Sequence, residues 1–487
     1  MCYGGAQNEE GHSIAQTSDG GYILAGAREN GANGWDFHAV KIGPSGSVQW
    51  QDMFGGTGTD KALAVIQTND NGYILMGYTY SNNGDVTTNH GGRDVWIVRL
   101  DSDGELQWEK SLGGTGGDYA STILQTLDGG FILAATTSSS DGDVTMNYGE
   151  DDIWLVKLDS VGAIQWERSY GGSGHDSPGN IRPTADGGYV LIASTLSNDG
   201  HVTNPLGDAD LWIVKLDDTG DIQWQKTYGG SGADAGGQLE PTSDGGYIIA
   251  AGTNSTDGDV TVALGNTDIW LVKIDATGAL QWQKSLGGSN TDAATGLVIT
   301  AGGEYVIGAY TASTNGDVTD YNGGFYDYWI VKVDASGALI WQQTLGGSAD
   351  DRARDIRYTT DGGYIITGFS NSTDGDVTDP IAGYDVWVVK LESDPTSIME
   401  NERAWAVALY PNPAQDHITL DLTLANAAFV QIALYNAMGQ QIRQVESGQH
   451  YSGDHTLRLW IADLASGIYQ VRLAVDGTEI TRKVVKM

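Results

Sequence analysis

Short apolar runs, separated by glycine-rich polar turns, recur along most of the chain. Each recurrence begins with a Gly-Gly pair that follows Tyr, Leu or Phe. Successive pairs are 51 residues apart once, 58 residues apart four times and 59 residues apart once. A period of this length indicates one supersecondary unit per repeat, stacked against its neighbours. The first glycines of the seven pairs are Gly4, Gly55, Gly113, Gly171, Gly229, Gly287 and Gly346.

Each repeat predicts four short antiparallel strands. The first follows the Gly-Gly pair, and a turn such as residues 128–130 leads into the second. The third strand is apolar on both faces, as in residues 94–98, so we expect it to lie between neighbouring units. A turn that ends in glycine leads to the fourth strand. Seven such units predict an all-β fold with a seven-bladed β-propeller over residues 1–392. An open solenoid is the alternative, and it would need distinct caps.

The two ends of the repeat region predict how such a propeller would close. The Trp of the fourth strand occurs six times, and the seventh repeat stops after its third strand, at residues 389–391. Residues 1–3 directly precede the first Gly-Gly pair, where a fourth strand would end. We therefore expect the N-terminal residues to complete the seventh blade. Since Met1 would then lie inside a strand, the sequence also predicts a signal peptide and further residues before it.

Residues 405–487 do not follow the repeat. Alternation in residues 430–434 and 469–473 predicts half-buried strands. The order of seven residues resembles the type A C-terminal sorting domain of the Bacteroidetes type IX secretion system. These residues are Pro411, Asn412, Pro413, Gly439, Gly467, Tyr469 and Lys483.

That resemblance implies a small β-sandwich that carries the protein through the type IX translocon and is removed by a surface sortase. It also implies an N-terminal signal peptide, and a secreted or outer-membrane cell-surface location. Residues 393–404 are then the predicted linker. The repeats resemble those of uncharacterised Bacteroidetes surface proteins, which brings no established activity. An ordinary β-sandwich accessory module is the alternative for the C-terminal segment.

The charge of the chain restricts its partners. The formal net charge is −38, and residues 1–404, with 19 Lys+Arg and 56 Asp+Glu, carry −37 of it. Such a surface repels nucleic acid and anionic lipid, so we expect neither as a partner. No apolar run is long enough to span a membrane. Cys2 is the one cysteine, which excludes an intramolecular disulfide and a cysteine-based zinc site.

Carboxylates two residues apart recur in the loop before the third strand, in the motif DGDVT. Their hard oxygen atoms suit Ca²⁺, although the full series of an EF-hand is absent. A side-chain-capped turn is the alternative, and the sequence favours it. The candidate calcium ligands are Asp141 with Asp143, Asp257 with Asp259, and Asp374 with Asp376; Asn83 and Asn315 replace the first Asp in two repeats.

An acid also recurs five residues after the first glycine of each pair. If the following strand is innermost, these acids form a ring around a common axis and repel one another unless they hold a cation or are solvated. Hydrogen bonding to the turn amides is the alternative that the sequence favours. The seven acids are Glu9, Asp60, Asp118, Asp176, Asp234, Asp292 and Asp351.

No catalytic motif is present, because the eight histidines share no repeat position and no nucleophile elbow, HExxH or P-loop occurs. The leading hypothesis is a non-catalytic surface protein that binds a ligand or partner, such as a glycan, through the propeller loops. A secreted glycan-active enzyme and a purely structural surface protein are the alternatives. Near-identical repeats favour binding or structure, whereas unique polar residues in one blade would favour an enzyme.

Overall fold

The computed structural model describes residues 1–5, 7–31, 34–381, 383–392, 405–410, 414–424, 427–436, 440–465, 467–475 and 478–486. The chain divides into two compact units, Met1–Thr396 and Ser397–Met487. Strands are the regular elements throughout the described parts, and no helix in them is long and apolar enough to cross a membrane. The predicted linker, residues 393–404, lies outside the described residues.

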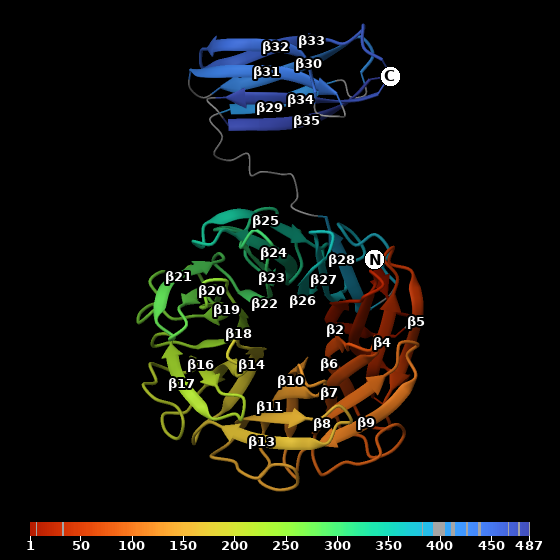
Figure 1. Cartoon of the computed structure of the whole chain (residues 1–487), viewed down its shortest axis with the longest axis vertical. Coiled ribbons are helices and arrows are strands. Elements are labelled where there is room, and N and C mark those ends of the chain that lie inside the picture. Colours follow the sequence, from red (N-terminus) through yellow and green to blue (C-terminus); the bar gives the residue numbers. More distant parts are fainter. Residues whose placement is uncertain are drawn as a thin grey trace. The chain divides into compact units, whose positions relative to one another are not determined.

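The first unit contains seven four-stranded antiparallel sheets, which we call blades 1 to 7 in chain order (Figure 1). In blades 1 to 6 the four strands lie side by side in chain order, and in all seven blades the first strand lies innermost, against the first strands of the two neighbouring blades. The first strands are β2 (Glu9–Gln16), β6 (Asp60–Gln67), β10 (Asp118–Gln125), β14 (Asp176–Pro183), β18 (Asp234–Pro241), β22 (Asp292–Ile299) and β26 (Asp351–Tyr358).

The second and third strands carry the core of the first unit. The second strands are β3 (Tyr22–Glu29), β7 (Tyr73–Thr79), β11 (Phe131–Thr137), β15 (Tyr189–Thr195), β19 (Tyr247–Thr253), β23 (Tyr305–Thr311) and β27 (Tyr364–Ser370). The third strands are β4 (Trp35–Ile42), β8 (Asp94–Leu100), β12 (Asp152–Leu158), β16 (Asp210–Leu216), β20 (Asp268–Ile274), β24 (Asp327–Val333) and β28 (Asp385–Leu391).

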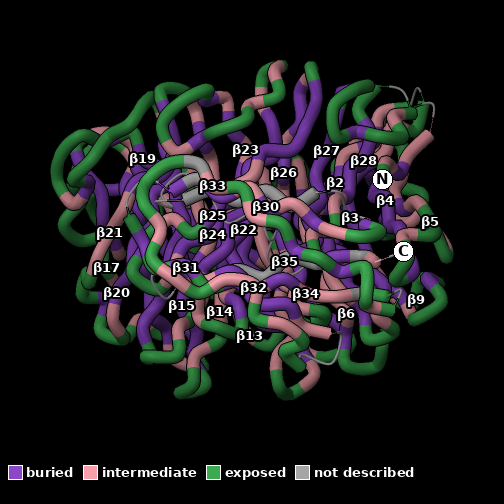
Figure 2. The backbone as a smooth tube through the Cα atoms, turned by 90° about the horizontal axis from the view of Figure 1, so that it is seen from above, coloured by how far each residue is buried: buried purple, intermediate pink, exposed green. Residues whose placement is uncertain are grey.

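Both faces of a third strand are buried because each blade is covered by the next. The strands of the first unit are largely buried, whereas its loops are exposed (Figure 2). In β8 every residue is buried, and Trp96 packs on Phe37 of the preceding blade with ring centroids 4.5 Å apart. The Trp96 indole nitrogen donates a hydrogen bond to Glu109, 2.8 Å away on the adjoining fourth strand. An apolar residue on either face therefore gains a packing partner, as the sequence pattern predicted.

The fourth strands form the outer edge of the blades, and their outer residues are exposed. In blade 7 the outer position is occupied by β1 (Cys2–Tyr3), which pairs antiparallel with β28 in the register Cys2 to Trp387 and Tyr3 to Val386. The Tyr3 hydroxyl also donates to the Gly46 carbonyl, 2.7 Å away in blade 1. The other fourth strands are β5 (Val48–Phe54), β9 (Leu106–Leu112), β13 (Ile164–Tyr170), β17 (Ile222–Tyr228), β21 (Leu280–Leu286) and β25 (Leu339–Leu345).

The Gly-Gly pairs mark places where the backbone leaves no room for a side chain. A Cβ atom on Gly113 would lie 2.3 Å from the Asp118 carboxylate, and one on Gly114 would lie 2.4 Å from the Asp141 carbonyl oxygen. Real Cβ contacts are not this short, so both positions require glycine. The pair thereby lets the DGDVT loop lie directly against the turn that starts the first strand.

The C-terminal unit consists of two antiparallel sheets around one apolar core that includes Ile418, Val430 and Val471. One sheet has the order β29-β30-β33 and the other β32-β31-β34-β35. The strands are β29 (Trp405–Tyr410), β30 (His417–Leu424), β31 (Ala428–Asn436), β32 (Gln441–His450), β33 (Gly453–Trp460), β34 (Gly467–Val475) and β35 (Thr478–Lys486).

Candidate functional site

Every first strand of the seven blades contains a β-bulge near its start, after the second residue in blade 5 and after the third residue in the other six blades. A bulge leaves one or two residues without a partner on the neighbouring strand and re-aims their side chains. The bulged residues share a position, but their chemistry varies among the blades. They are His12, Leu63, Ser121, Gly179 with Asn180, Gly236 with Gly237, Thr295 and Arg354.

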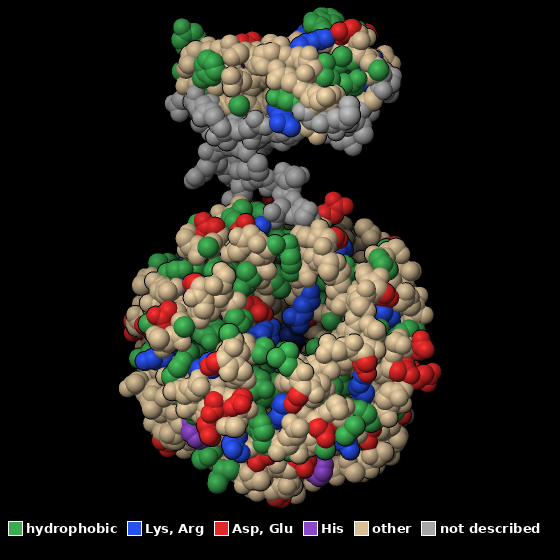
Figure 3. Space-filling model, viewed as in Figure 1, with side chains coloured by type: hydrophobic (Ala, Val, Ile, Leu, Met, Phe, Trp, Pro, Cys, Tyr) green, Lys and Arg blue, Asp and Glu red, His purple; other side chains and the backbone are tan. Residues whose placement is uncertain are grey.

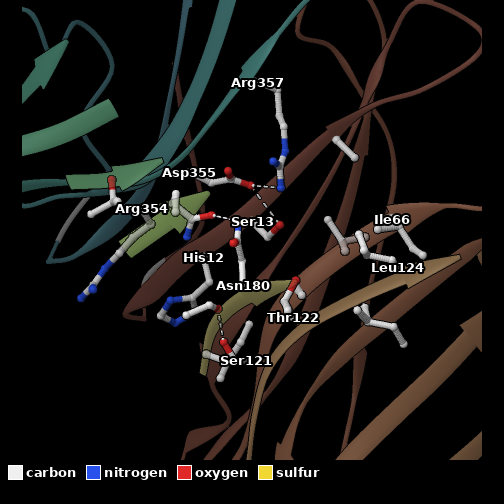
Figure 4. A pocket seen from close by; sticks show the side chains of 18 of the residues that line it. His12, Ser13, Ile66, Ser121, Thr122, Leu124, Asn180, Arg354, Asp355 and Arg357 are labelled. Carbon is white, nitrogen blue, oxygen red and sulfur yellow. Dashed lines mark hydrogen bonds and ion pairs between the residues drawn. The ribbon is translucent and has the colours of Figure 1, made fainter. Parts of the chain in front are cut away.

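A cavity of about 490 Å³ lies among the first strands, and residues of all seven blades line it. We call it the central cavity (Figure 4). The bulged residues of six blades line it, and blade 5 contributes Gln238, the residue directly after its bulge. Figure 3 shows the hollow in the middle of the first unit, with Lys and Arg side chains around it. The bulges therefore bring dissimilar side chains to one cavity, which is partly open to solvent.

One side of the central cavity is apolar and the other is polar. Ile66 and Leu124 lie on one side, and Arg354 and His12 lie on the other (Figure 4). Ile66 and Leu124 are only half-buried, so their apolar surface faces the cavity. Such a wall with a few directed polar groups is typical of small-molecule sites.

Asp355 ties blade 7 to blade 1 at the wall of the cavity. Its Oδ2 atom accepts hydrogen bonds from the Ser13 hydroxyl at 3.1 Å and the Ile14 backbone N–H at 3.0 Å. The Arg357 guanidinium lies 3.1 Å from the same oxygen. Burial raises the pKa of Asp355, and the charge of Arg357 acts in the opposite direction. This carboxylate is thus occupied in joining two blades.

Blades 4 and 5 are joined in a similar way. The Asn180 amide donates to Gln238 at 2.8 Å and accepts from the Leu239 N–H at 3.1 Å. Arg182 donates through two nitrogens to Glu240 Oε1, the shorter contact being 2.6 Å. The polar groups of this wall are therefore engaged with one another.

Arg354 differs from the other polar residues of the cavity. Among the described residues, no hydrogen bond or ion pair reaches its guanidinium, and its Nε atom is buried. Its nearest recorded ring is Phe369, whose centroid lies 5.3 Å from the Arg354 Cζ atom. Arginine is always charged at physiological pH. The cavity thus contains a cation whose charge the described side chains do not neutralise.

The histidine beside it adds no compensating charge. Burial lowers the pKa of His12, so its ring is neutral near pH 7. Its Nε2 atom lies 3.2 Å from Glu10, which Lys61 also contacts at 2.8 Å. Although burial opposes it, hydrogen bonds from His12 and Lys61 hold the pKa of Glu10 at about 2. The Glu10 carboxylate is thus shared by these two groups.

The predicted calcium ligands bind the turn of their own blade. Asp257 accepts a hydrogen bond from the Ser231 N–H at 2.6 Å, and Asp259 accepts one from the Gly229 N–H at 3.3 Å. Asn315 uses its side-chain oxygen for the same bond to Ser289, at 2.9 Å. Since an amide replaces the carboxylate without changing the contact, the geometry favours the capped turn. Asp141 with Asp143 and Asp374 with Asp376 make the equivalent bonds.

The seven acids at the start of the first strands do not line the central cavity. They are fully buried, and six of them lie beside their own turn and second strand. Asp118, for example, accepts from the Gly114 N–H at 2.9 Å and from the Ser139 hydroxyl at 2.8 Å, and it also binds Thr137. Local hydrogen bonding, the alternative that the sequence favoured, accounts for Asp60, Asp118, Asp176, Asp234, Asp292 and Asp351. Glu9 instead lies 3.1 Å from Arg28.

A second buried acid stands at the start of each third strand. Asp327 accepts a hydrogen bond from the Asn322 N–H at 2.7 Å through Oδ2, whereas no hydrogen bond reaches its Oδ1 atom. Burial, reinforced by the charge of Asp351, raises the pKa of Asp327 to about 7. In the described parts of the chain, no three acids, histidines or cysteines are placed to hold a metal ion together.

The candidate sorting residues lie partly within the described C-terminal unit. Gly467 begins β34, and Tyr469 pairs with Val484 and donates its hydroxyl to the Ala465 carbonyl at 2.8 Å. Lys483 lies on β35 and pairs with Gln470 of β34. Pro411, Asn412, Pro413 and Gly439 lie outside the described residues.

Sequence reasoning did not find the central cavity. The residue eight positions after the first glycine of each pair is the bulge position, and it differs in every blade except blades 4 and 5. The residue directly before the bulge position is Gly, Ala or Pro, and the residue two positions after it is Ile, Leu or Val, as Ala353 and Ile356 are in blade 7. A search for the most variable position inside a predicted strand would have pointed to this site.

The C-terminal unit supplies the decisive comparison. Residues 408–487 match the family model described as the secretion system C-terminal sorting domain. The C-terminal unit is a sorting domain. This confirms the predicted export: the protein is carried to the cell surface or secreted, and its sorting domain meets the secretion machinery.

Other proteins are similar to larger parts of this chain at low sequence identity. Regulatory protein FlaEY of Caulobacter vibrioides is 26% identical over 275 residues, which are 48% of this chain and 28% of that protein. The chain thus spans less than a third of that relative. The solved extracellular domain of a putative one-component system from B. thetaiotaomicron is 12% identical, with a TM-score of 0.41, over 99% of this chain and 56% of that one. The WD40 domain of Neurospora crassa Pan2 is 11% identical, with a TM-score of 0.38, over 74% and 85%.

Proposed function

We propose that residues 1–392 form a closed seven-bladed β-propeller that binds a small ligand in the central cavity at the cell surface, without transforming it. The observation that carries this proposal is the set of bulges, which turns dissimilar residues of the blades toward one cavity. Where the blades are alike, their side chains are used in holding the blades together. Binding is thus assigned to the positions where the repeat varies, and not to the DGDVT loops.

The pairings of the chain ends support the closed propeller. β1 fills the outer position of blade 7, and β26 of blade 7 lies against β2 of blade 1. Asp355 of blade 7 also receives hydrogen bonds from Ser13 and Ile14 of blade 1. These contacts connect the first and last repeats as neighbouring blades are connected elsewhere.

The lining of the cavity favours binding over the two alternatives. Its volume of about 490 Å³ lies in the range of small-molecule sites, roughly 300–1,000 Å³. A purely structural propeller would gain stability by filling this space with apolar side chains. A glycoside hydrolase needs two carboxyl groups on either side of the bond, and Asp355 is the one acid among the residues that line the cavity.

A blocked cavity tests the proposal. Leu63 lines the cavity without a polar partner, so Leu63→Trp adds bulk there, whereas Leu106→Trp adds the same group to an exposed position on β9. The full chain is offered a glycan array and a panel of small metabolites. We expect ligands of the wild type to bind at least ten-fold more weakly to Leu63→Trp and unchanged to Leu106→Trp.

Two results would contradict the proposal. If Leu63→Trp binds the ligands as tightly as the wild type does, the binding site lies in the propeller loops and not in the central cavity. Conversion of a bound ligand into a product, detected by mass spectrometry, would favour the alternative that the protein is a glycan-active enzyme.

A further inference from the structure

We propose that the ligand of the central cavity carries a carboxylate, which pairs with Arg354, and an apolar part, which lies against Ile66 and Leu124. This inference rests on the proposed binding function and names the chemical class of the ligand. A uronic acid and an aromatic acid share this chemistry, and the experiment below separates them.

The charge of the side chains that line the cavity has the opposite sign from the net charge of the whole chain. The chain carries −38, yet the charged side chains that line the cavity are three arginines and one aspartate. Arg182 is paired with Glu240, and Arg357 is paired with Asp355. Arg354 remains, so the cavity holds one uncompensated positive charge among its described groups.

Two arginines on β26 show that this lack of a partner is specific. Arg352 lies before the bulge and Arg354 lies in it, and both contact the ring of Phe369, with Cζ atoms 5.9 and 5.3 Å from its centroid. Arg352 is neutralised by Asp350, whose Oδ1 lies 3.0 Å from its Nε. Arg354 has the same ring but no carboxylate, and it lines the cavity.

The Nε atom of Arg354 is buried without a hydrogen-bond acceptor, which is costly because that N–H has lost water, while the side chain as a whole is only half-buried and can be reached by a ligand in the cavity. A carboxylate suits it better than other ligand groups, since the planar fork of arginine binds both carboxylate oxygens at once. His12 is neutral and Glu10 is already shared by His12 and Lys61, so neither takes this place. The half-buried Ile66 and Leu124 gain from covering by an apolar group on the same ligand.

Isothermal titration calorimetry of the full chain tests this inference with two matched pairs. Phenylacetate is compared with the neutral phenylacetamide, and glucuronate is compared with the neutral glucose. We expect at least one acid to bind ten-fold or more tightly than its neutral partner. A preference confined to phenylacetate indicates an aromatic acid, and one confined to glucuronate indicates an acidic sugar.

Variants assign the preference to one side chain. Arg354→Gln should remove it, whereas Arg168→Gln, which removes a charge from an exposed position on β13, should keep it. Arg354→Lys keeps the charge without the planar fork, so it should retain the preference at reduced affinity, and it serves as the test if Arg354→Gln does not fold.

The inference is overturned if neither acid is preferred over its neutral partner, or if Arg354→Gln keeps the preference. If neutral ligands bind the wild type but not Leu63→Trp, the cavity still binds a ligand, and only the inference that this ligand carries a carboxylate is wrong.

Discussion

Replacing Asp327 by Asn should stabilise the first unit at pH 8 and leave it nearly unchanged at pH 4. Asp327 is fully buried at the start of β24, and its pKa is raised from 3.8 to about 7. Between these two values the folded protein holds a proton that the unfolded chain has released. The contribution that protonated Asp327 makes to the free energy of unfolding is therefore fully present below about pH 4, and it is lost as the pH rises toward 7.

The geometry shows why the amide fits. A Cβ atom on Gly346 would lie 2.4 Å from Asp327 Oδ1 and 2.8 Å from Asp351 Oδ2, so these two oxygens face each other across the glycine. In Asp327→Asn the amide oxygen can keep the bond from the Asn322 N–H. The NH₂ group then takes the place of Oδ1 and faces the Asp351 carboxylate as a donor.

The size of the effect follows from the pKa. A rise of about 3 units corresponds to about 4 kcal/mol, and relaxation around a buried charge reduces this to about 2 kcal/mol. For a unit of this length, that free energy raises the unfolding midpoint by about 2 °C. Differential scanning fluorimetry of the full chain at pH 4 and pH 8 measures it.

A matched control reverses the sign. Asp128 is half exposed, and hydrogen bonds from Lys157 and Thr126 lower its pKa to about 2. Asp128→Asn should therefore lower the midpoint at pH 8, by the equivalent of about 1 kcal/mol or less, since water screens the pair. If Asp327→Asn lowers the midpoint equally at both pH values, the buried charge is not the cause and the reasoning fails.

Three further perturbations test the architecture by thermal unfolding. Gly114→Ala should lower the free energy of unfolding by about 2–4 kcal/mol, because its Cβ would overlap the Asp141 carbonyl oxygen. The control Gly117→Ala, whose Cβ would have its nearest contact at 3.6 Å, should lower it by less than about 1 kcal/mol. Equal losses in the two variants would contradict the close approach at Gly114. Removing residues 1–3 should lower the midpoint and make the β28 edge cleavable by trypsin after Lys390, and unchanged protection would contradict the β1 pairing. Asp257→Asn should leave the unfolding midpoint unchanged, whereas Asp257→Ala should lower the free energy of unfolding by about 1 kcal/mol, because the bond to the Ser231 N–H is lost. Ca²⁺ and Na⁺ at matched ionic strength should shift the midpoint of the wild type equally. A rise of the midpoint that only Ca²⁺ produces would support a calcium site after all.

The strands could be predicted from the sequence because their pattern is set by burial. The third strand expected around residues 94–98 is present in the structure as β8 (Asp94–Leu100). Its central residues are apolar on both faces because both faces meet another blade, and the second strand of each repeat is buried in a similar way. The Gly-Gly pairs were equally readable, since only glycine allows the loop to approach so closely.

The bulges could not be predicted from the same pattern. A bulge is a property of the backbone, and alternation of apolar residues is interrupted by only one position, such as Arg354 between Ala353 and Asp355. A plain alternating strand would assign this residue to a face between blades. Only the register of β26 with β27 shows that it leaves the pairing and lines the cavity instead.

The acidity of the chain illustrates why a repeated feature and a binding feature must be separated. Six of the first-strand acids bind the amides and hydroxyls of their own blade, and an equivalent partner recurs each time. A group whose partner recurs in six blades is explained by the repeat, whatever its charge. A group such as Arg354, which occurs once and has no described partner, is not explained in this way. The net charge of −38 therefore predicts repulsion of anions at long range, while the local chemistry of the cavity selects one anion at short range.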